Sequence, residues 1–190
     1  MTSSSQAPPD PSQDKLIRQA VKGDGEAFGL LYAQHLDAIY RYVRLRIGSE
    51  ADAEDMTEDV FVKAWEALPG YRIGEHPFTS WLYRIAHNVT VDYHRKRQPD
   101  SSAEMDDHHG EGGHVEELVA HRQQMSELVA AVQKLDDSEQ DVVILRFVQG
   151  YSHDEVAAMI GKTVNATRVI QHRALAKLGK VLKNEGLSNG

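Results

Sequence analysis

The amino-acid sequence predicts an all-α protein made of two small helical domains joined by a flexible acidic linker, the C-terminal domain being a helix-turn-helix. Three observations support this fold class. Apolar residues recur at helical spacing in successive segments, and no stretch shows the sustained alternation that marks a strand. Between Gln98 and Glu117 the periodicity stops and glycine, serine and acids dominate, so this stretch buries too little apolar surface to offset its ordering entropy.

These observations divide the 190 residues into four parts. We expect a disordered tail at 1–13, a first domain at 14–98, a flexible linker at 99–122 and a second domain at 123–184. Each domain is near the lower size limit for an independent core.

Composition excludes several classes of protein. The chain has no cysteine, which rules out disulfides, zinc-thiolate sites and a thiol nucleophile. It has no apolar run close to the roughly 20 residues that span a bilayer, and its first residues do not resemble a signal peptide. We therefore expect a cytoplasmic protein without membrane insertion.

The first domain is predicted to contain three helices. The first runs from about Glu26 to Ile47, and Gly48-Ser49 ends it. The second runs from about Ala51 to Leu68, has an acid-rich first turn that suits the helix dipole, and stops at Pro69-Gly70. After a loop at 71–77, the third runs from Phe78 to about Arg97. Its expected outward residues are Arg84, His87, Asn88, Val91 and Arg95.

The second domain is predicted to end in a helix-turn-helix. A helix at about 115–135 comes first, and Asp136-Asp-Ser-Glu starts the next. Ser152-His-Asp-Glu155 then forms a capping box, and Gly161 suits the left-handed position that ends a short helix. Thr163 can cap the last helix, whose outer face carries Asn165, Arg168, Val169, His172 and Arg173. These side chains suit a major groove, although an ordinary helical hairpin with a solvated polar face is the alternative.

Charge is segregated along the chain. The net charge of −8 opposes binding to DNA, so either DNA is not the ligand or binding is local and depends on a partner. Acids crowd residues 50–66, whereas residues 162–183 contain six bases and no acid. This separation favours local DNA binding that depends on a partner.

Two segments together carry a family resemblance. One contains Asp52-Ala-Glu-Asp, Phe78-Thr-Ser-Trp-Leu and Arg84-Ile-Ala-His-Asn, and the other contains Gly150-Tyr-Ser, Glu155-Val-Ala and Gln171-His-Arg-Ala. In this order they resemble the second and fourth conserved regions of bacterial sigma factors of the small, extracytoplasmic-function type. The resemblance covers roughly residues 14–98 and 123–183. Thr167 and Asn165 depart from it, since the family usually has an aliphatic residue and often a glycine there.

The resemblance implies a promoter-specificity subunit of RNA polymerase with no catalytic residues, no metal and no cofactor. Its partners would be promoter DNA and core polymerase, through the clamp helices of the largest subunit and the flap of the second largest. An anti-sigma factor is a further candidate partner.

The implied site residues form three groups. The polymerase clamp would be met by Asp52, Glu54, Asp55, Glu58, Phe61 and Trp65, for which a merely solvated helix face is the alternative. The −10 promoter element would be met by Tyr71, Arg72, Arg84, His87, Asn88, Arg95 and Arg97. The loop at 71–77 is the candidate pocket for a flipped base, Asn88 can hydrogen-bond base edges, and Arg84, Arg95 and Arg97 suit phosphates. The −35 element would be read by Lys162, Thr163, Asn165, Arg168, Val169, His172 and Arg173.

Other interpretations stay open at this point. The acidic linker could mimic nucleic acid inside the polymerase or be a plain spacer, and its histidines His108, His109 and His114 are more typical of solvated residues than of a metal site. An ordinary helix-turn-helix regulator would bind duplex DNA by itself, which the net charge opposes. A hydrolase is weakly supported, because the sequence has neither a HExxH motif nor a nucleophile elbow nor a phosphate-cradling glycine loop.

Overall fold

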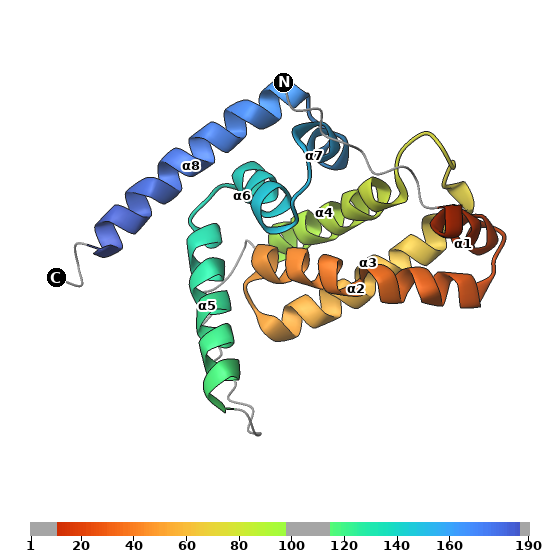
Figure 1. The fold of residues 1–190 in the computed structure, drawn as a ribbon, viewed down its shortest axis with the longest axis horizontal. Helices are drawn as coiled ribbons and strands as arrows, with labels where there is room; N and C mark the ends of the chain where they lie inside the picture. The colour runs from red at the N-terminus through yellow and green to blue at the C-terminus, as the bar shows by residue number, and fades with distance from the viewer. Residues whose placement is uncertain (1–10, 98–114, 187–190) are drawn as a thin grey trace.

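The computed structural model describes residues 11–97 and 115–186, which form a set of packed helices (Figure 1). The N-terminal half, residues 11–97, contains α1 (Pro11–Val21), α2 (Gly25–Ile47), α3 (Glu50–Ala67), a short 3₁₀ turn η1 (Leu68–Gly70) and α4 (Phe78–Arg97). The C-terminal half, residues 115–186, contains α5 (Val115–Gln133), α6 (Asp137–Val143), a π-helical turn η2 (Ile144–Val148), α7 (His153–Ile160) and α8 (Val164–Gly186). Within these two ranges there is no strand, so the all-α prediction is confirmed.

Two of the expected domain boundaries, the end of the tail and the end of the linker, differ in the structure. Helix α1 begins at Pro11, so residues 11–13 are helical and do not belong to a disordered tail. Helix α5 begins at Val115, where the sequence predicts a helix to start, so residues 115–122 belong to this helix and not to the linker. The rest of the tail and of the linker, with the three linker histidines, lies outside the described residues.

Helix α1 itself was not expected from the sequence. It buries Ile17 and Ala20 against the rest of the N-terminal half. Pro11 occupies its first position, where the missing amide hydrogen is not needed. With so few apolar positions, the helix depends on packing against α2 more than on its own periodicity.

Residues of the types that usually cap helices begin α2 and α3 and end α2. Asp24 caps α2 by accepting from the amides of Glu26 and Ala27. Gly48 ends α2 at φ 84°, a conformation that side-chain-bearing residues rarely adopt. Ser49 then caps α3 by accepting from the amide of Asp52. The tight turn between them folds α3 back along α2.

The two halves share one hydrophobic core. The main cluster of buried apolar residues includes Ile39, Tyr42 and Leu82 from the N-terminal half and Val142 and Met159 from the C-terminal half. Helix α4 packs against α7, and α2 packs against α5, as Figure 1 shows. The halves are therefore in contact rather than held apart. No helix in the described ranges is long and apolar enough to cross a bilayer.

Candidate nucleic-acid interface

The helix-turn-helix forms as the sequence predicts. The Ser152 hydroxyl accepts from the amide of Glu155, and the Glu155 carboxylate accepts from the amide of Ser152, which completes the capping box of α7. Gly161 ends α7 in the left-handed conformation at φ 65°. Thr163 Oγ1 then accepts from the amide of Ala166 at the start of α8. These local contacts fix the turn between the two helices.

Helix α8 presents its predicted outer face to solvent. Thr167 and Ala174 are fully buried on its inner side, as expected. The residues assigned to the −35 element are all exposed, namely Lys162, Thr163, Asn165, Arg168, Val169, His172 and Arg173. A half-exposed valine among polar and basic groups suits contact with base edges and a thymine methyl.

Two bases of α8 are held by carboxylates at the start of α6. Lys177 Nζ lies 2.6 Å from Glu139 Oε2 and 3.2 Å from Asp136 Oδ2. The Arg173 guanidinium lies 3.8 Å from both Asp136 and Glu139. The hydrogen bond from Lys177 to Glu139 raises the pKa of Lys177. Arg173 therefore faces α6 as well as solvent, and this contact fixes how α8 lies on its domain.

Most acids of α3 form an exposed row. Glu54, Asp55 and Glu58 are exposed, whereas Asp52 is partly covered and accepts a 2.7 Å hydrogen bond from the Tyr93 hydroxyl. Phe61 is only 5% exposed, so it belongs to the core and not to the surface where we placed it.

Aromatic pairs join α3 to α2. The ring of Phe61 packs edge-on against Tyr32, and the ring of Trp65 packs against Phe28 with centroids 4.9 Å apart. Trp65 keeps 39% of its surface exposed next to the acidic row. Of the two aromatic residues assigned to the polymerase, only Trp65 is accessible.

The loop at 71–77 is held by its own contacts. The Tyr71 hydroxyl donates to the His76 carbonyl over 2.7 Å, and its ring packs against Phe78 and Trp81. Arg72 is exposed and pairs with Glu75 at 3.2 Å. The groove that the structure does have lies away from this loop, between α3 and α4, and is lined by Met56, Asp59, Lys63, Val89, Asp92, Tyr93 and Lys96.

Helix α4 has two covered sides, which the sequence pattern did not indicate. Its predicted apolar side packs on α2 and α3. A second side faces the C-terminal half, where Arg84 Nη2 donates to the Ala158 carbonyl over 2.9 Å and His87 Nδ1 lies 3.0 Å from Asp141 Oδ2. Arg84 stays exposed despite this bond, as do Asn88 and Arg95, and Arg95 pairs with Asp92. The side chain of Arg97 lies outside the described residues.

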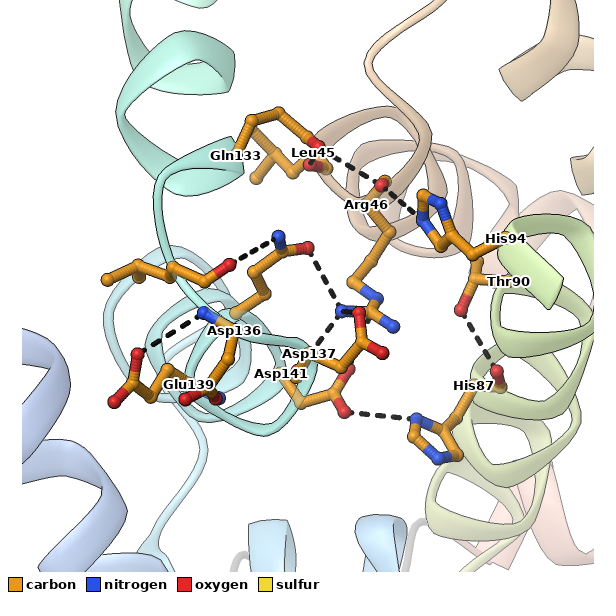
Figure 2. A network of polar contacts seen from close by, with 12 residues as sticks. Leu45, Arg46, His87, Thr90, His94, Gln133, Asp136, Asp137, Glu139 and Asp141 are labelled. Atoms are coloured by element: carbon orange, nitrogen blue, oxygen red, sulfur yellow. Dashed lines mark hydrogen bonds and ion pairs between the residues drawn. The ribbon is translucent and has the colours of Figure 1, made fainter. Parts of the chain in front are cut away.

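Figure 2 shows a polar network where the two halves meet. Arg46 of α2 is fully buried, with Nε 3.4 Å from Asp141 Oδ1 and Nη1 3.0 Å from Gln140 Oε1. The Tyr42 hydroxyl donates to Asp141 Oδ1 over 2.7 Å. Gln133 of α5 donates to the carbonyls of Leu45 and Arg46, at 2.8 and 3.0 Å.

Asp141 is the centre of this network. Burial raises the pKa of Asp141, but the hydrogen bond from His87 and the charge of Arg46 outweigh burial and lower it overall. Burial and the neighbouring carboxylate raise the pKa of Tyr42 well above its ordinary value, so Tyr42 acts as a donor. Sequence patterns did not single out Arg46, Tyr42 or Asp141, because their partners are about 100 residues away in the chain. Arg46 is one of three arginines among the apolar residues at the end of α2, so nothing in the sequence set it apart.

In the described parts of the chain, no group of three or more histidine or acidic side chains is arranged to hold a metal ion.

Two family models match this chain. Residues 31–99 match the model described as Sigma-70 region 2, and residues 131–180 match the model described as Sigma-70, region 4. The first match falls in the N-terminal half and the second in the C-terminal half.

Curated relatives cover nearly the whole chain. The chain is 32% identical to the RNA polymerase sigma factor CnrH of Cupriavidus metallidurans, across 92% of this chain and 96% of CnrH. It is 33% identical to the ECF RNA polymerase sigma factor BldN of Streptomyces coelicolor, across 90% of this chain but 66% of BldN. It is 28% identical to the ECF RNA polymerase sigma factor SigW of Bacillus subtilis, across 90% of this chain and 96% of SigW.

Solved structures share the fold. CnrH in complex with the cytosolic domain of CnrY superposes with a TM-score of 0.73 at 31% identity, across 91% of this chain and 98% of CnrH. The sigma factor RpoE of Bartonella quintana, in complex with the anti-sigma factor NepR, gives a TM-score of 0.66 at 21% identity.

Proposed function

Because this chain belongs to the sigma-70 family, in its extracytoplasmic-function group, we propose that its exposed surfaces divide promoter recognition and polymerase binding between its two halves. As a member of this family it is a transcription initiation factor that gives RNA polymerase its promoter specificity. What we propose is which residues bind the promoter and which bind the polymerase.

In this proposal the C-terminal half reads the −35 element in duplex form. Helix α8 enters the major groove with Asn165, Arg168, Val169 and His172, all of them exposed. Arg173 and Lys162 flank these residues and suit phosphate contacts. The carboxylates of Asp136 and Glu139 pair with Arg173 and Lys177 of α8 and so help to set the angle at which α8 lies on its domain. The same half also contacts the flap of the second largest polymerase subunit.

The N-terminal half meets the −10 element through α4. Asn88 is exposed and can hydrogen-bond base edges, and Arg95 can reach phosphates once it leaves Asp92. Arg84 and His87 join this face when their contacts with the C-terminal half are released. Arg97 and the loop with Tyr71 and Arg72 complete the −10 surface.

The acidic row of α3 docks on the clamp helices of the largest polymerase subunit. Glu54, Asp55 and Glu58 supply charge, and the exposed edge of Trp65 supplies apolar contact. The observation that supports this division best is the pair of opposite exposed surfaces, acidic on α3 and polar to basic on α8. Each lies within one of the two segments that match the family models.

The remaining parts of the proposal follow from this role. The protein performs no catalytic chemistry of its own and works in the cytoplasm, where it meets the polymerase. Since CnrH has been solved with the cytosolic domain of CnrY, we also propose that this chain is held by an anti-sigma factor.

In vitro transcription tests the proposed function directly. Purified protein is combined with bacterial core polymerase and a genomic DNA library, and start sites are mapped by sequencing the transcripts. We expect starts that share motifs near −35 and −10 and that vanish without the protein. Unchanged start sites with and without the protein would contradict the proposal.

A further inference from the structure

An aromatic cluster forms the base of the loop at 71–77. The ring of Tyr71, the first residue of the loop, lies 5.7 Å from the ring of Phe78 and 5.1 Å from that of Trp81. Phe78 follows the end of the loop, is only 5% exposed, and also packs against Trp81. The cluster therefore joins the two ends of the loop, and the shape of the loop depends on where these rings lie.

Helix α2 contacts this cluster through His35, and α1 contacts His35 in turn. The ring of His35 lies 5.5 Å from the ring of Phe78. Gln13 Nε2 of α1 lies 3.1 Å from Nε2 of the same imidazole. Helix α1 also contacts η1, the turn that directly precedes Tyr71 (Figure 1). A continuous set of contacts thus runs from α1 through two rings to the loop.

The charge states of His35 and Tyr71 suit these contacts. Burial lowers the pKa of His35 from its ordinary value of 6.5, so the ring is neutral at pH 7. A neutral imidazole has one acceptor nitrogen, and the amide of Gln13 is a matching donor. Burial, and after it the carboxylate of Asp14 in α1, raise the pKa of Tyr71. Tyr71 therefore keeps the proton that it donates to the His76 carbonyl.

Helix α1 has no role in DNA or polymerase binding so far. It lies outside the ranges 31–99 and 131–180 that match the family models. A loop that receives an unstacked base gains affinity and selectivity when it is ordered beforehand, because side chains that become ordered only on binding weaken it. The contacts of α1 order the loop in this way without DNA.

We infer that Gln13 and His35 are positioning residues for recognition of the −10 element, which act through Phe78 to hold the loop at 71–77 in the shape that receives a flipped base. Neither residue contacts the DNA. The use of the loop for a flipped base rests on the proposed function, whereas the contact between α1 and the loop does not.

Tryptophan fluorescence measures the effect of α1 on the loop in the free protein. The chain has two tryptophans, so Trp65→Phe leaves Trp81 as the one reporter. In this background His35→Ala should raise the acrylamide quenching constant of Trp81 about twofold, because the cluster becomes mobile. Gln13→Ala should raise it less. Gln19→Ala, the same change at an exposed position of α1, should leave it unchanged.

Transcription with core polymerase measures the effect on base selection. A promoter found by start-site mapping is compared with versions that carry single substitutions at −10 or at −35, in protein that retains Trp65. Gln13→Ala should reduce the preference for the original −10 base by about fivefold at one position or more, because one hydrogen bond that holds the loop is lost. His35→Ala should reduce this preference further. Preference at −35 and binding to core polymerase should stay unchanged.

His35→Phe separates the hydrogen bond from the ring contact. It keeps an aromatic ring beside Phe78 and removes the acceptor of Gln13, so it should behave like Gln13→Ala. Combining His35→Phe with Gln13→Ala should add nothing, because both changes remove the same bond. These two single variants also decide the question if His35→Ala does not fold.

Two results would overturn the inference. One is quenching of Trp81 that is the same in Gln13→Ala, His35→Phe and Gln19→Ala. The other is an equal fall in transcription from every −10 sequence, which a general loss of stability would give. Failure to support any transcription would count against the proposed function instead, and the quenching would still decide whether α1 holds the loop.

Discussion

The hydroxyl of Tyr42 donates a 2.7 Å hydrogen bond to Asp141, joining α2 to α6 across 99 positions of sequence. The same carboxylate also faces Arg46 and His87. One acidic side chain of the C-terminal half thus contacts three residues of the N-terminal half. Its ionisation should be visible in the stability of the protein.

Acid should weaken the contact between the two halves through Asp141. The pKa of Asp141 is lowered in the folded protein from its ordinary value of 3.8. Its contribution is therefore fully present above about pH 4 and is lost as the pH falls through the lower folded value. Thermal unfolding followed between about pH 5 and pH 2 should show a smaller loss of stability for Asp141→Asn than for the unaltered protein. Parallel curves for the two proteins would rule this out.

The free protein should bind duplex promoter DNA poorly at physiological salt. Its net charge of −8 opposes the approach of a polyanion despite the exposed bases of α8. Core polymerase should restore binding. A mobility-shift assay with a promoter found by start-site mapping measures both, and tight binding by the free protein would support an autonomous regulator instead.

Reversing charge on the acidic row should weaken polymerase binding. Asp55→Lys with Glu58→Lys should reduce association with core polymerase without loss of helix, since both side chains are exposed. Glu127→Lys with Asp154→Lys changes the net charge equally at exposed positions of the other half. Pull-down measures association and circular dichroism measures helix content. Equal binding by the two double variants would place the docking surface elsewhere.

The two DNA contacts should fail in different ways. A bidentate base contact discriminates by about 1–3 kcal/mol. Arg168→Ala should therefore lower transcription and abolish its sensitivity to −35 mutations. Asn88→Ala should impair opening of the duplex, so a template melted in advance at −10 should rescue Asn88→Ala but not Arg168→Ala. Equal rescue of both would disprove the division of labour.

Glu139 of α6 should contribute more to the stability of the protein than Glu155, which has the same capping position in α7. It completes the capping box of α6 while buried, and it also pairs with Lys177 of α8. Glu139→Gln should lower the free energy of unfolding by about 1–3 kcal/mol, because a charged hydrogen bond is lost from a buried position. Glu155→Gln, at the same capping position of α7, should have a smaller effect. Urea unfolding of both variants tests this, and an equal loss would show that capping alone is responsible.

Local signals in the sequence predicted most of the fold. Capping at Ser152, the left-handed Gly161 and the break at Gly48 depend on a few neighbouring residues, and the structure has each of them. The inner side of α8 likewise followed from its periodicity. Helix α1 was missed, because its two buried residues give a weak pattern that only packing on α2 makes decisive.

The contact between the halves could not be predicted in the same way. A helical pattern shows one apolar side, so the second covered side of α4 was interpreted as exposed. Phe61 was placed at the surface by the family resemblance, which does not show which side of α3 packs on α2. Arg46 is a basic residue in a sequence rich in them, and only the fold brings Asp141 close enough to neutralise it while buried.

The buried pair of Arg46 and Asp141 has a consequence for protein engineering. Each half holds one member of the pair, so a chimaera that joins residues 1–97 of this chain to the C-terminal half of a relative retains Arg46 with whatever residue that relative has in place of Asp141. Unless that residue is also acidic, the hybrid either buries an unneutralised guanidinium or loses the contact between its halves. The halves of this protein are therefore not freely interchangeable modules, and a synthetic regulator that uses one of them must carry over both members of the pair together.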